Sequence, residues 1–172
     1  MTTLATPDVR FHRSWAEAVA EFTADGTQMH GSGLWEFDEL DTTEAGCRAL
    51  AARLAEMGDP AYELPDDKVH SSYYWIVEGD EFVGYLALRH TLNDWLLNEG
   101  GHIGFSVRPS RRRQGYAARA LALALPEAAA LGLDRVLLTC DEDNTASART
   151  IETNGGVYED SRNGKRRYWI NL

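Results

Sequence analysis

The chain has 172 residues, of which 44% are hydrophobic and 26% are charged, and its formal net charge is −10. This length suits one domain with a sizeable core, and the apolar content excludes a chain that is mainly disordered. No apolar stretch approaches the roughly 20 residues of a membrane-spanning helix, and no signal-peptide pattern is present. Cys47 and Cys140 lack disulfide-framework or metal-ligand spacing. We expect a cytoplasmic protein with free thiols, no metal and no membrane contact.

The charges are distributed unevenly along the chain. Residues 1–106 carry 6 Lys and Arg against 19 Asp and Glu, whereas residues 107–172 carry 11 against 8. An acidic body argues against nucleic-acid binding, which needs many cationic contacts to phosphates. The more basic second part is compatible with a small anionic ligand, although acidic surfaces also serve solubility alone.

The first part of the chain has the periodicity of helices. Apolar residues at helical spacing between Trp15 and Phe22 predict an amphipathic helix over residues 12–24, with Ser14 as its N-cap. A second helix is expected over residues 43–57.

From residue 73 onward, strand patterns alternate with helical ones. The predicted strands cover residues 73–77, 82–89, 102–107, 135–140, 157–160 and 166–172. Helices are expected over residues 115–131 and 144–154, and Pro126 should bend or break the first of these. This order predicts a mixed α+β sheet with helices on its faces. We expect a single domain over residues 1–172, in which residues 1–70 form helices and loops and residues 71–172 form the sheet.

The segment most informative about chemistry follows the strand that ends at Val107. Pro109 prevents further pairing of that strand, and a basic loop then leads to a helix that begins near Gly115. A helix N-terminus presents unpaired N–H groups and favours anions, and a glycine lets a phosphate approach the backbone closely. Taken alone, such a loop is equally compatible with a solvated basic surface or a docking patch for an acidic partner.

The spacing of this loop is informative as well. The pattern Arg112-x-x-Gly115-x-Ala117 after a strand resembles the pyrophosphate loop of the GNAT N-acetyltransferase superfamily, which binds acetyl-CoA. The resemblance covers about residues 73–160. The upstream segment LNDWLLNEGGHIGFSVRP, together with HGSG near the start of the chain, also resembles one branch of predicted bacterial acetyltransferases.

A second motif of the same family follows the next strand. Asn144, Ser147 and Ile151, followed by the pair Gly155-Gly156, resemble the second cofactor segment of GNAT enzymes. Two linked motifs in the right order are more specific than either alone.

The resemblance implies a GNAT fold, with a mixed, mostly antiparallel central sheet flanked by helices and a V-shaped cleft for acetyl-CoA. It implies direct transfer of the acetyl group to a primary amine in a ternary complex. The residues that it places at the cofactor are Val107, Arg112, Arg113, Gln114, Gly115, Tyr116, Ala117, Asn144 and Ser147. The acceptor is expected to be a small-molecule amine or a protein amino group, and the acidic N-terminal part favours a cationic one.

The general acid and base are less clearly indicated. Many family members carry a Tyr directly after the Leu/Ile position of the second segment, where this chain has Glu152. Tyr158 is therefore the candidate acid, with water as the alternative. His102 is the first candidate base because histidine titrates near neutrality, and Glu99 is the second. Both His102 and Tyr158 are also compatible with ordinary structural roles in strands.

Three further points stay open at the level of sequence. Because the family Tyr is missing, a non-catalytic acyl-CoA-binding sensor is the alternative function. Related folds often dimerise through terminal strands, so the segment Tyr168–Ile170 either forms a homodimer interface or completes the sheet. The aromatic and acidic segment Trp35–Asp38 suits a cationic amine, or it packs the N-terminal loop on the core.

Overall fold

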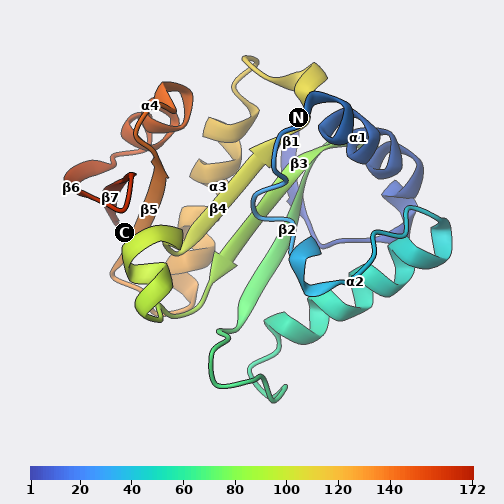
Figure 1. Ribbon diagram of the computed structural model, residues 1–172, viewed down its shortest axis with the longest axis horizontal. Helices are drawn as coiled ribbons and strands as arrows, with labels where there is room; N and C mark the ends of the chain where they lie inside the picture. Colours follow the sequence, from blue (N-terminus) through green and yellow to red (C-terminus); the bar gives the residue numbers. More distant parts are fainter.

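The computed structural model describes residues 1–172, which form two antiparallel sheets and four α-helices (Figure 1). The first sheet has the strand order β1-β2-β3-β4, and the second has the order β5-β7-β6. The strands are β1 (Thr2–Ala5), β2 (Ser71–Glu78), β3 (Glu81–Arg89), β4 (Ile103–Val107), β5 (Arg135–Asp141), β6 (Val157–Arg162) and β7 (Lys165–Asn171). The helices are α1 (His12–Asp25), α2 (Glu44–Gly58), α3 (Tyr116–Ala130) and α4 (Thr145–Thr153). The predicted mixed α+β architecture is therefore confirmed.

The first sheet separates two hydrophobic cores. Alternate residues of a strand point to opposite faces, so Tyr85 of β3 packs toward α1 and α2, whereas Leu86 packs toward α3. On the α1 side, the indoles of Trp15 and Trp75 are stacked with centroids 5.9 Å apart, and Trp15 Nε1 donates to Tyr85 Oη at 2.9 Å. Figure 1 shows α1 and α2 on one side of the first sheet, and the second sheet with α4 beyond β4.

The start of α1 differs from the prediction. Ser14 does not cap the helix, because α1 begins earlier, at His12, after a 3-10 turn over Val9–Phe11. The side chain of Asp8 caps that turn by accepting a hydrogen bond from Arg10 N–H at 2.8 Å. The Ser14 hydroxyl instead accepts a hydrogen bond from Phe82 N–H at 2.9 Å and so ties α1 to β3.

Two other elements differ from the prediction. Pro126 does not break α3, which continues to Ala130, because the loss of one N–H bond is offset by packing of small residues against the sheet, Ala124 and Ala128 among them. Residues 1–70 are not only helices and loops, since β1 pairs antiparallel with β2 in the first sheet.

The terminal strand completes the second sheet. β7 lies between β5 and β6 and is paired on both sides, and Tyr168 and Ile170 are buried. The segment Tyr168–Ile170 is thus engaged within the chain, and homodimerisation stays a prediction. None of the helices combines the length and the apolar character that a bilayer-crossing helix needs.

Candidate active site

The two sheets are joined through His102, which directly precedes β4. The His102 N–H donates to the Leu137 carbonyl of β5 at 2.7 Å, and the Leu137 N–H donates to His102 Nδ1 at 2.9 Å. No strand pairing between β4 and β5 continues beyond this link, so the sheets separate after residue 102.

The register of β4 decides which of its backbone groups face the gap. Arg89 N–H donates to the His102 carbonyl and Arg108 N–H donates to the Val83 carbonyl, so the even-numbered residues of β4 bond to β3. The residues between them, Phe105 and Val107 included, direct their N–H and C=O groups away from β3 and toward β5. One wall of the gap is therefore a strand edge with free hydrogen-bonding groups, except for the Val107 carbonyl, which accepts a hydrogen bond from Arg112 Nε.

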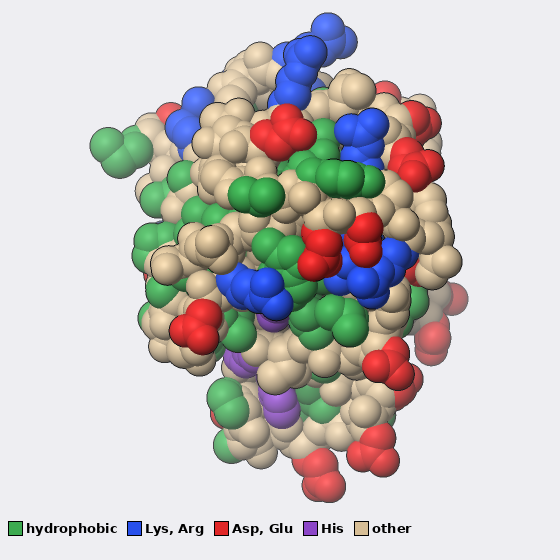
Figure 2. Space-filling model, turned by 90° about the vertical axis from the view of Figure 1, so that its left-hand side faces the viewer, with side chains coloured by type: hydrophobic (Ala, Val, Ile, Leu, Met, Phe, Trp, Pro, Cys, Tyr) green, Lys and Arg blue, Asp and Glu red, His purple; other side chains and the backbone are tan.

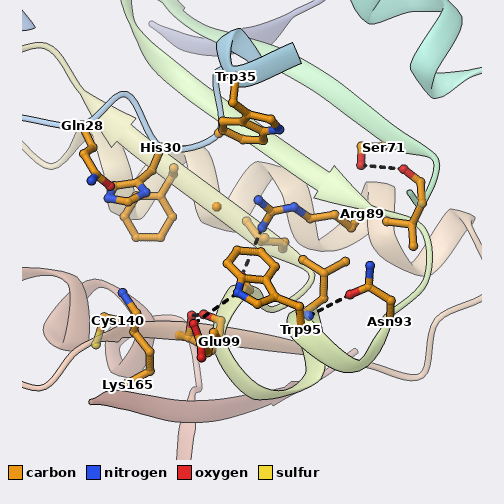
Figure 3. A pocket seen from close by; sticks show the side chains of 18 of the residues that line it. Gln28, His30, Trp35, Ser71, Arg89, Asn93, Trp95, Glu99, Cys140 and Lys165 are labelled. Carbon is orange, nitrogen blue, oxygen red and sulfur yellow. Dashed lines mark hydrogen bonds between the residues drawn. The ribbon is translucent and has the colours of Figure 1, made fainter. Parts of the chain in front are cut away.

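A pocket of about 520 Å³ lies where the sheets separate (Figure 3). Its walls include β4 from Ile103 to Phe105, β5 from Thr139 to Asp141, and the start of α4. On the other side it is lined by the loop that follows α1, by the end of β3, and by the turn of π-helix over Leu96–Gly100. This pocket is the V-shaped cleft predicted from the family resemblance.

The predicted anion site lies beyond the end of β4. Gly115 adopts φ +80°, a left-handed conformation that favours glycine, and it caps the N-terminus of α3. The backbone N–H groups of residues 113–118 donate no hydrogen bond within the chain. A fan of unpaired N–H groups at the positive end of a helix dipole is suited to a phosphate or diphosphate.

The arginines of this loop mostly hold it in place. Arg112 donates to the Val107 carbonyl from Nε at 3.1 Å and forms an ion pair with Asp25 at 2.8 Å. Arg108 is buried and pairs with Glu21, and Arg111 pairs with Glu81. Arg112, which was predicted to bind the cofactor, thus anchors the loop to the end of α1.

The pair of Arg108 and Glu21 is the most buried of these ion pairs. Hydrogen bonds from Arg108 hold the pKa of the Glu21 carboxyl at about 2, and Ser110 donates to the same carboxylate. This arrangement fixes the loop against α1 before any ligand binds.

Two cations of the loop region have no carboxylate partner. Arg113 is exposed and forms no ion pair, and Gln114 contacts only the Ser110 carbonyl at 3.4 Å. Arg119 lies one turn into α3, where its guanidinium covers the Tyr116 ring at 4.7 Å. An added Cβ on Gly115 would lie 2.8 Å from Arg119 Nη1. Sequence reasoning missed Arg119, although its position four residues after Gly115 places it on the same side of the helix start.

The second predicted cofactor segment lies at the pocket. Asn144 caps α4 by accepting a hydrogen bond from Ser147 N–H at 3.1 Å, and both residues line the pocket. The Ser147 hydroxyl is half-buried and has no hydrogen-bond partner within the chain. Cys140 lines the same wall, and burial raises the pKa of its thiol.

The structure brings only one of the three predicted catalytic residues into the pocket. Glu99 lines it, and its carboxylate accepts hydrogen bonds from Trp95 Nε1 at 3.2 Å and Asn163 Nδ2 at 2.9 Å. His102 is buried at the strand link, outside the lining, and burial lowers its pKa to about 4. Tyr158 is 53% exposed on β6, where its hydroxyl is 3.0 Å from the Ser161 hydroxyl. The catalytic roles of His102 and Tyr158 stay predictions.

Sequence reasoning missed a buried arginine in the pocket. Arg89 ends β3, lines the pocket and donates from Nη1 to the carbonyls of Gly100 and Gly101 at 3.1 and 3.4 Å. Burial lowers the pKa of its guanidinium. The available signal was a charged residue at the end of an otherwise apolar strand.

Comparison with known proteins identifies the family of this chain. A sequence model of the acetyltransferase (GNAT) domain matches residues 9–157. The chain belongs to the GNAT acetyltransferase family. A search among curated proteins found no significant match. The predicted fold and the predicted enzyme class, an acyltransferase, are confirmed.

Solved structures of GNAT acetyltransferases have the same fold. RimJ of Mycobacterium smegmatis, in complex with CoA-disulfide, is 18% identical with a TM-score of 0.70, over 99% of this chain and 82% of RimJ. An acetyltransferase from Salmonella typhimurium that modifies the N-terminal serine of ribosomal protein L7/L12 is 17% identical, with a TM-score of 0.65. The alignment covers 99% of this chain and 95% of that protein. The microcin C7 self-immunity acetyltransferase MccE, bound to acetyl-CoA and AMP, is 12% identical, with a TM-score of 0.68. The alignment covers 99% of this chain and 92% of MccE. The prediction of acetyl-CoA as co-substrate agrees with the ligands of these neighbours.

Proposed function

We propose that this GNAT enzyme transfers the acetyl group of acetyl-CoA to a primary amine, by direct attack in a ternary complex within the cleft between β4 and β5. The observation that carries the proposal is the combination of two binding features. The unpaired N–H groups of residues 113–118 suit the diphosphate, and the free edge of β4 suits the extended pantetheine arm.

The edge of β4 holds the thioester in this proposal. The pantetheine amides pair with the free N–H and C=O groups of Phe105 and with the free N–H group of Val107, as an additional strand would. A backbone N–H of β4 then faces the thioester carbonyl and stabilises the oxyanion of the tetrahedral intermediate. One such donor is worth about 3–4 kcal/mol in the transition state.

Glu99 is the proposed general base. Its carboxylate lines the pocket and forms no ion pair, and each of its oxygens accepts one hydrogen bond and keeps a further lone pair, with which it accepts the proton of an ammonium group directly or through a water molecule. The neutral amine attacks the thioester carbon, and the C–S bond breaks as the carbonyl forms again. His102 is less suited to this step, because its Nδ1 is already bonded to Leu137 N–H.

Ser147 is the proposed partner of the departing sulfur. Its hydroxyl lines the pocket at the start of α4 and has no partner within the chain. It donates a hydrogen bond to the thiolate, and the proton that the attacking nitrogen loses as the amide forms reaches the sulfur through this hydroxyl or through water. Glu152, which stands where many family members have Tyr, accepts a hydrogen bond from the Tyr168 hydroxyl at 3.2 Å.

The acceptor is a small-molecule amine or a protein amino group. The neighbour from Salmonella typhimurium modifies a protein N-terminus, whereas MccE was solved with a nucleotide. Release of coenzyme A thiol, measured with acetyl-CoA and a panel of amines and peptides, tests the proposal. Turnover with at least one amine supports it, whereas tight acetyl-CoA binding without turnover of any amine favours a non-catalytic sensor.

The third interpretation of the basic loop, as a docking patch for an acidic partner, has less support. Three of its arginines already form ion pairs within the chain. Figure 2 shows basic and acidic side chains interspersed on the face that carries the second sheet, without one large basic area.

A further inference from the structure

A buried arginine without an ionic partner faces the acceptor side of the pocket. Arg89 is 8% exposed, and no carboxylate lies within ion-pair distance of its guanidinium. Its Nη1 is bonded to the carbonyls of Gly100 and Gly101, whereas Nε and Nη2 have no hydrogen-bond partner within the chain. Figure 3 shows the guanidinium pointing into the pocket between the labelled indoles of Trp35 and Trp95.

The guanidinium of Arg89 lies beside β4, the strand that borders the pocket. A Cβ added to Gly104 of β4 would lie 3.2 Å from Arg89 Nη1 and 3.4 Å from Nη2. Glycine at this position therefore leaves the space that the guanidinium occupies. The charge lies next to the strand edge at which the thioester is proposed to bind, on the face that is covered by α1 and α2.

A guanidinium stays charged in proteins, and an unpaired buried charge is costly unless a ligand supplies the opposite charge. The other cations of the pocket already have partners within the chain. Lys68 pairs with Glu36 at 3.1 Å, and Lys165 pairs with Asp141 at 2.5 Å. Arg89 is thus the cation of the pocket that is free for an anionic group of the substrate.

The carboxylate of Glu99 supplies the complementary charge. Glu99 directly precedes Gly100, whose carbonyl accepts the hydrogen bond from Arg89. The Glu99 carboxylate forms no ion pair. Asp67, at the exposed edge of the pocket, is the other acid without a cationic partner. A cation and a carboxylate at one end of the same pocket match a substrate that carries both an ammonium and a carboxylate group.

We propose that the acceptor is an α-amino acid, or a close analogue with a free carboxylate next to its amine, and that Arg89 binds this carboxylate while the amine faces Glu99. The inference rests on the proposed function and specifies its substrate class. Trp35 and Trp95, which are 55% and 58% exposed, flank the site and favour an apolar or aromatic side chain. A protein N-terminus fits less well, because its first carboxyl group is part of a peptide bond.

The test compares amino acids with their own carboxamides. Thiol release is measured with phenylalanine, tryptophan and methionine and with the corresponding amides, which lack only the negative charge. The α-ammonium group of an amino acid amide loses its proton more readily than that of the free amino acid. The intrinsic reactivity of the amine therefore favours the amide. The expected result is a kcat/KM about 100-fold higher for the amino acid, the effect of a charge-assisted hydrogen-bonded pair.

Variants assign this preference to the arginine. Arg89→Gln should abolish the preference for the amino acid, and Arg89→Lys should retain part of it, because a lysine keeps the charge without the planar donor pair. Lys68→Gln is the matched control, since it removes a pocket cation that is already paired, and it should leave the preference unchanged. Thermal unfolding and coenzyme A affinity show whether each variant is folded.

Several outcomes would overturn the inference without affecting the proposed function. Equal or faster turnover of the amides, turnover of peptides in preference to amino acids, or an unchanged preference in folded Arg89→Gln would each do so. If no amine of the panel is turned over, the binding of each amino acid and of its amide to the enzyme–coenzyme A complex is measured by calorimetry and tests the inference instead. Amino acids that bind no better than their amides contradict the inference, whereas a failure to bind coenzyme A at all contradicts the proposed function.

Discussion

The imidazole of His102 occupies the place of a strand partner for Leu137. Its Nδ1 accepts a hydrogen bond from Leu137 N–H at 2.9 Å, while the His102 N–H donates to the Leu137 carbonyl at 2.7 Å. In a continuous β-ladder, a backbone carbonyl would accept the hydrogen bond from Leu137 N–H. A side chain that replaces the carbonyl ends the ladder at this point, and the cleft opens immediately after it.

This relationship predicts a pH-dependent contribution to stability. Burial lowers the pKa of His102 from 6.5 to about 4, so the unfolded chain binds a proton more readily than the folded one in this range. The stabilisation by the neutral imidazole is complete above about pH 6.5 and is lost as the pH falls toward 4. His102→Ala should cost about 1–3 kcal/mol at pH 7.5, because a buried N–H loses its partner.

Urea unfolding of the wild type and His102→Ala at pH 7.5 and pH 5 measures this effect. The difference in unfolding free energy between the two proteins should be smaller at pH 5. A difference that stays constant or grows on acidification would show that His102 is not the neutral link described here.

Substitution of Glu99 tests the proposed base. Glu99→Gln should lower kcat/KM by about 100-fold or more, since general base catalysis contributes at least that factor, with little change in coenzyme A affinity. Asp94→Asn is the control, because Asp94 is an exposed acid of the same segment that does not line the pocket.

The dependence of kcat/KM on pH distinguishes Glu99 from His102. If Glu99→Gln removes the acidic limb of the profile and folded His102→Ala retains it, the assignment of the base to Glu99 is supported. The opposite pattern would return the role to His102, as first predicted.

The local patterns of the sequence were sufficient for most elements and for the cofactor side of the site. Gly115 and Asn144 stand at helix starts where the backbone needs a left-handed residue and a side-chain cap, and both requirements are visible in short segments. The alternation of Ile103, Phe105 and Val107 with smaller or polar residues is equally visible in the sequence, and these three residues pack on the α3 face of β4.

The acceptor side could not be predicted in the same way. Arg89 becomes a pocket residue only because Gly104 of the next strand and the carbonyls of Gly100 and Gly101 lie around it, which depends on the register between strands. β1 is a short strand without a strong alternation, and it is defined by pairing with a strand about 70 residues later in the chain.

A pair of glycines tests the phosphate loop. Gly115 and Gly132 have similar φ values, +80° and +86°, so replacement by Ala should destabilise the fold by a similar amount, about 1–2 kcal/mol. Only Gly115 lies at the start of α3, and Gly115→Ala should also weaken coenzyme A binding by about tenfold, one lost anion contact. Titration calorimetry of both variants checks this, and equal coenzyme A affinities would contradict the role of the loop.

A second pair of variants tests the partner of the departing sulfur. Ser147→Ala should lower kcat by about tenfold, the value of a neutral hydrogen bond made in the transition state. Tyr158→Phe should leave kcat unchanged, because the Tyr158 hydroxyl is bonded to Ser161 outside the pocket. Stopped-flow measurement of thiol release gives both rates. A large loss in Tyr158→Phe with none in Ser147→Ala would restore Tyr158 as the acid.

In the proposed function, the N–H groups at the start of α3 bind the diphosphate of acetyl-CoA while the open edge of β4 holds its thioester arm. Titration of the ¹⁵N-labelled protein with coenzyme A, followed by amide NMR, tests it most directly. The largest shifts are expected at residues 113–118, together with Phe105 and Val107. Saturable binding that leaves these amides unshifted, or no binding at all, would contradict it.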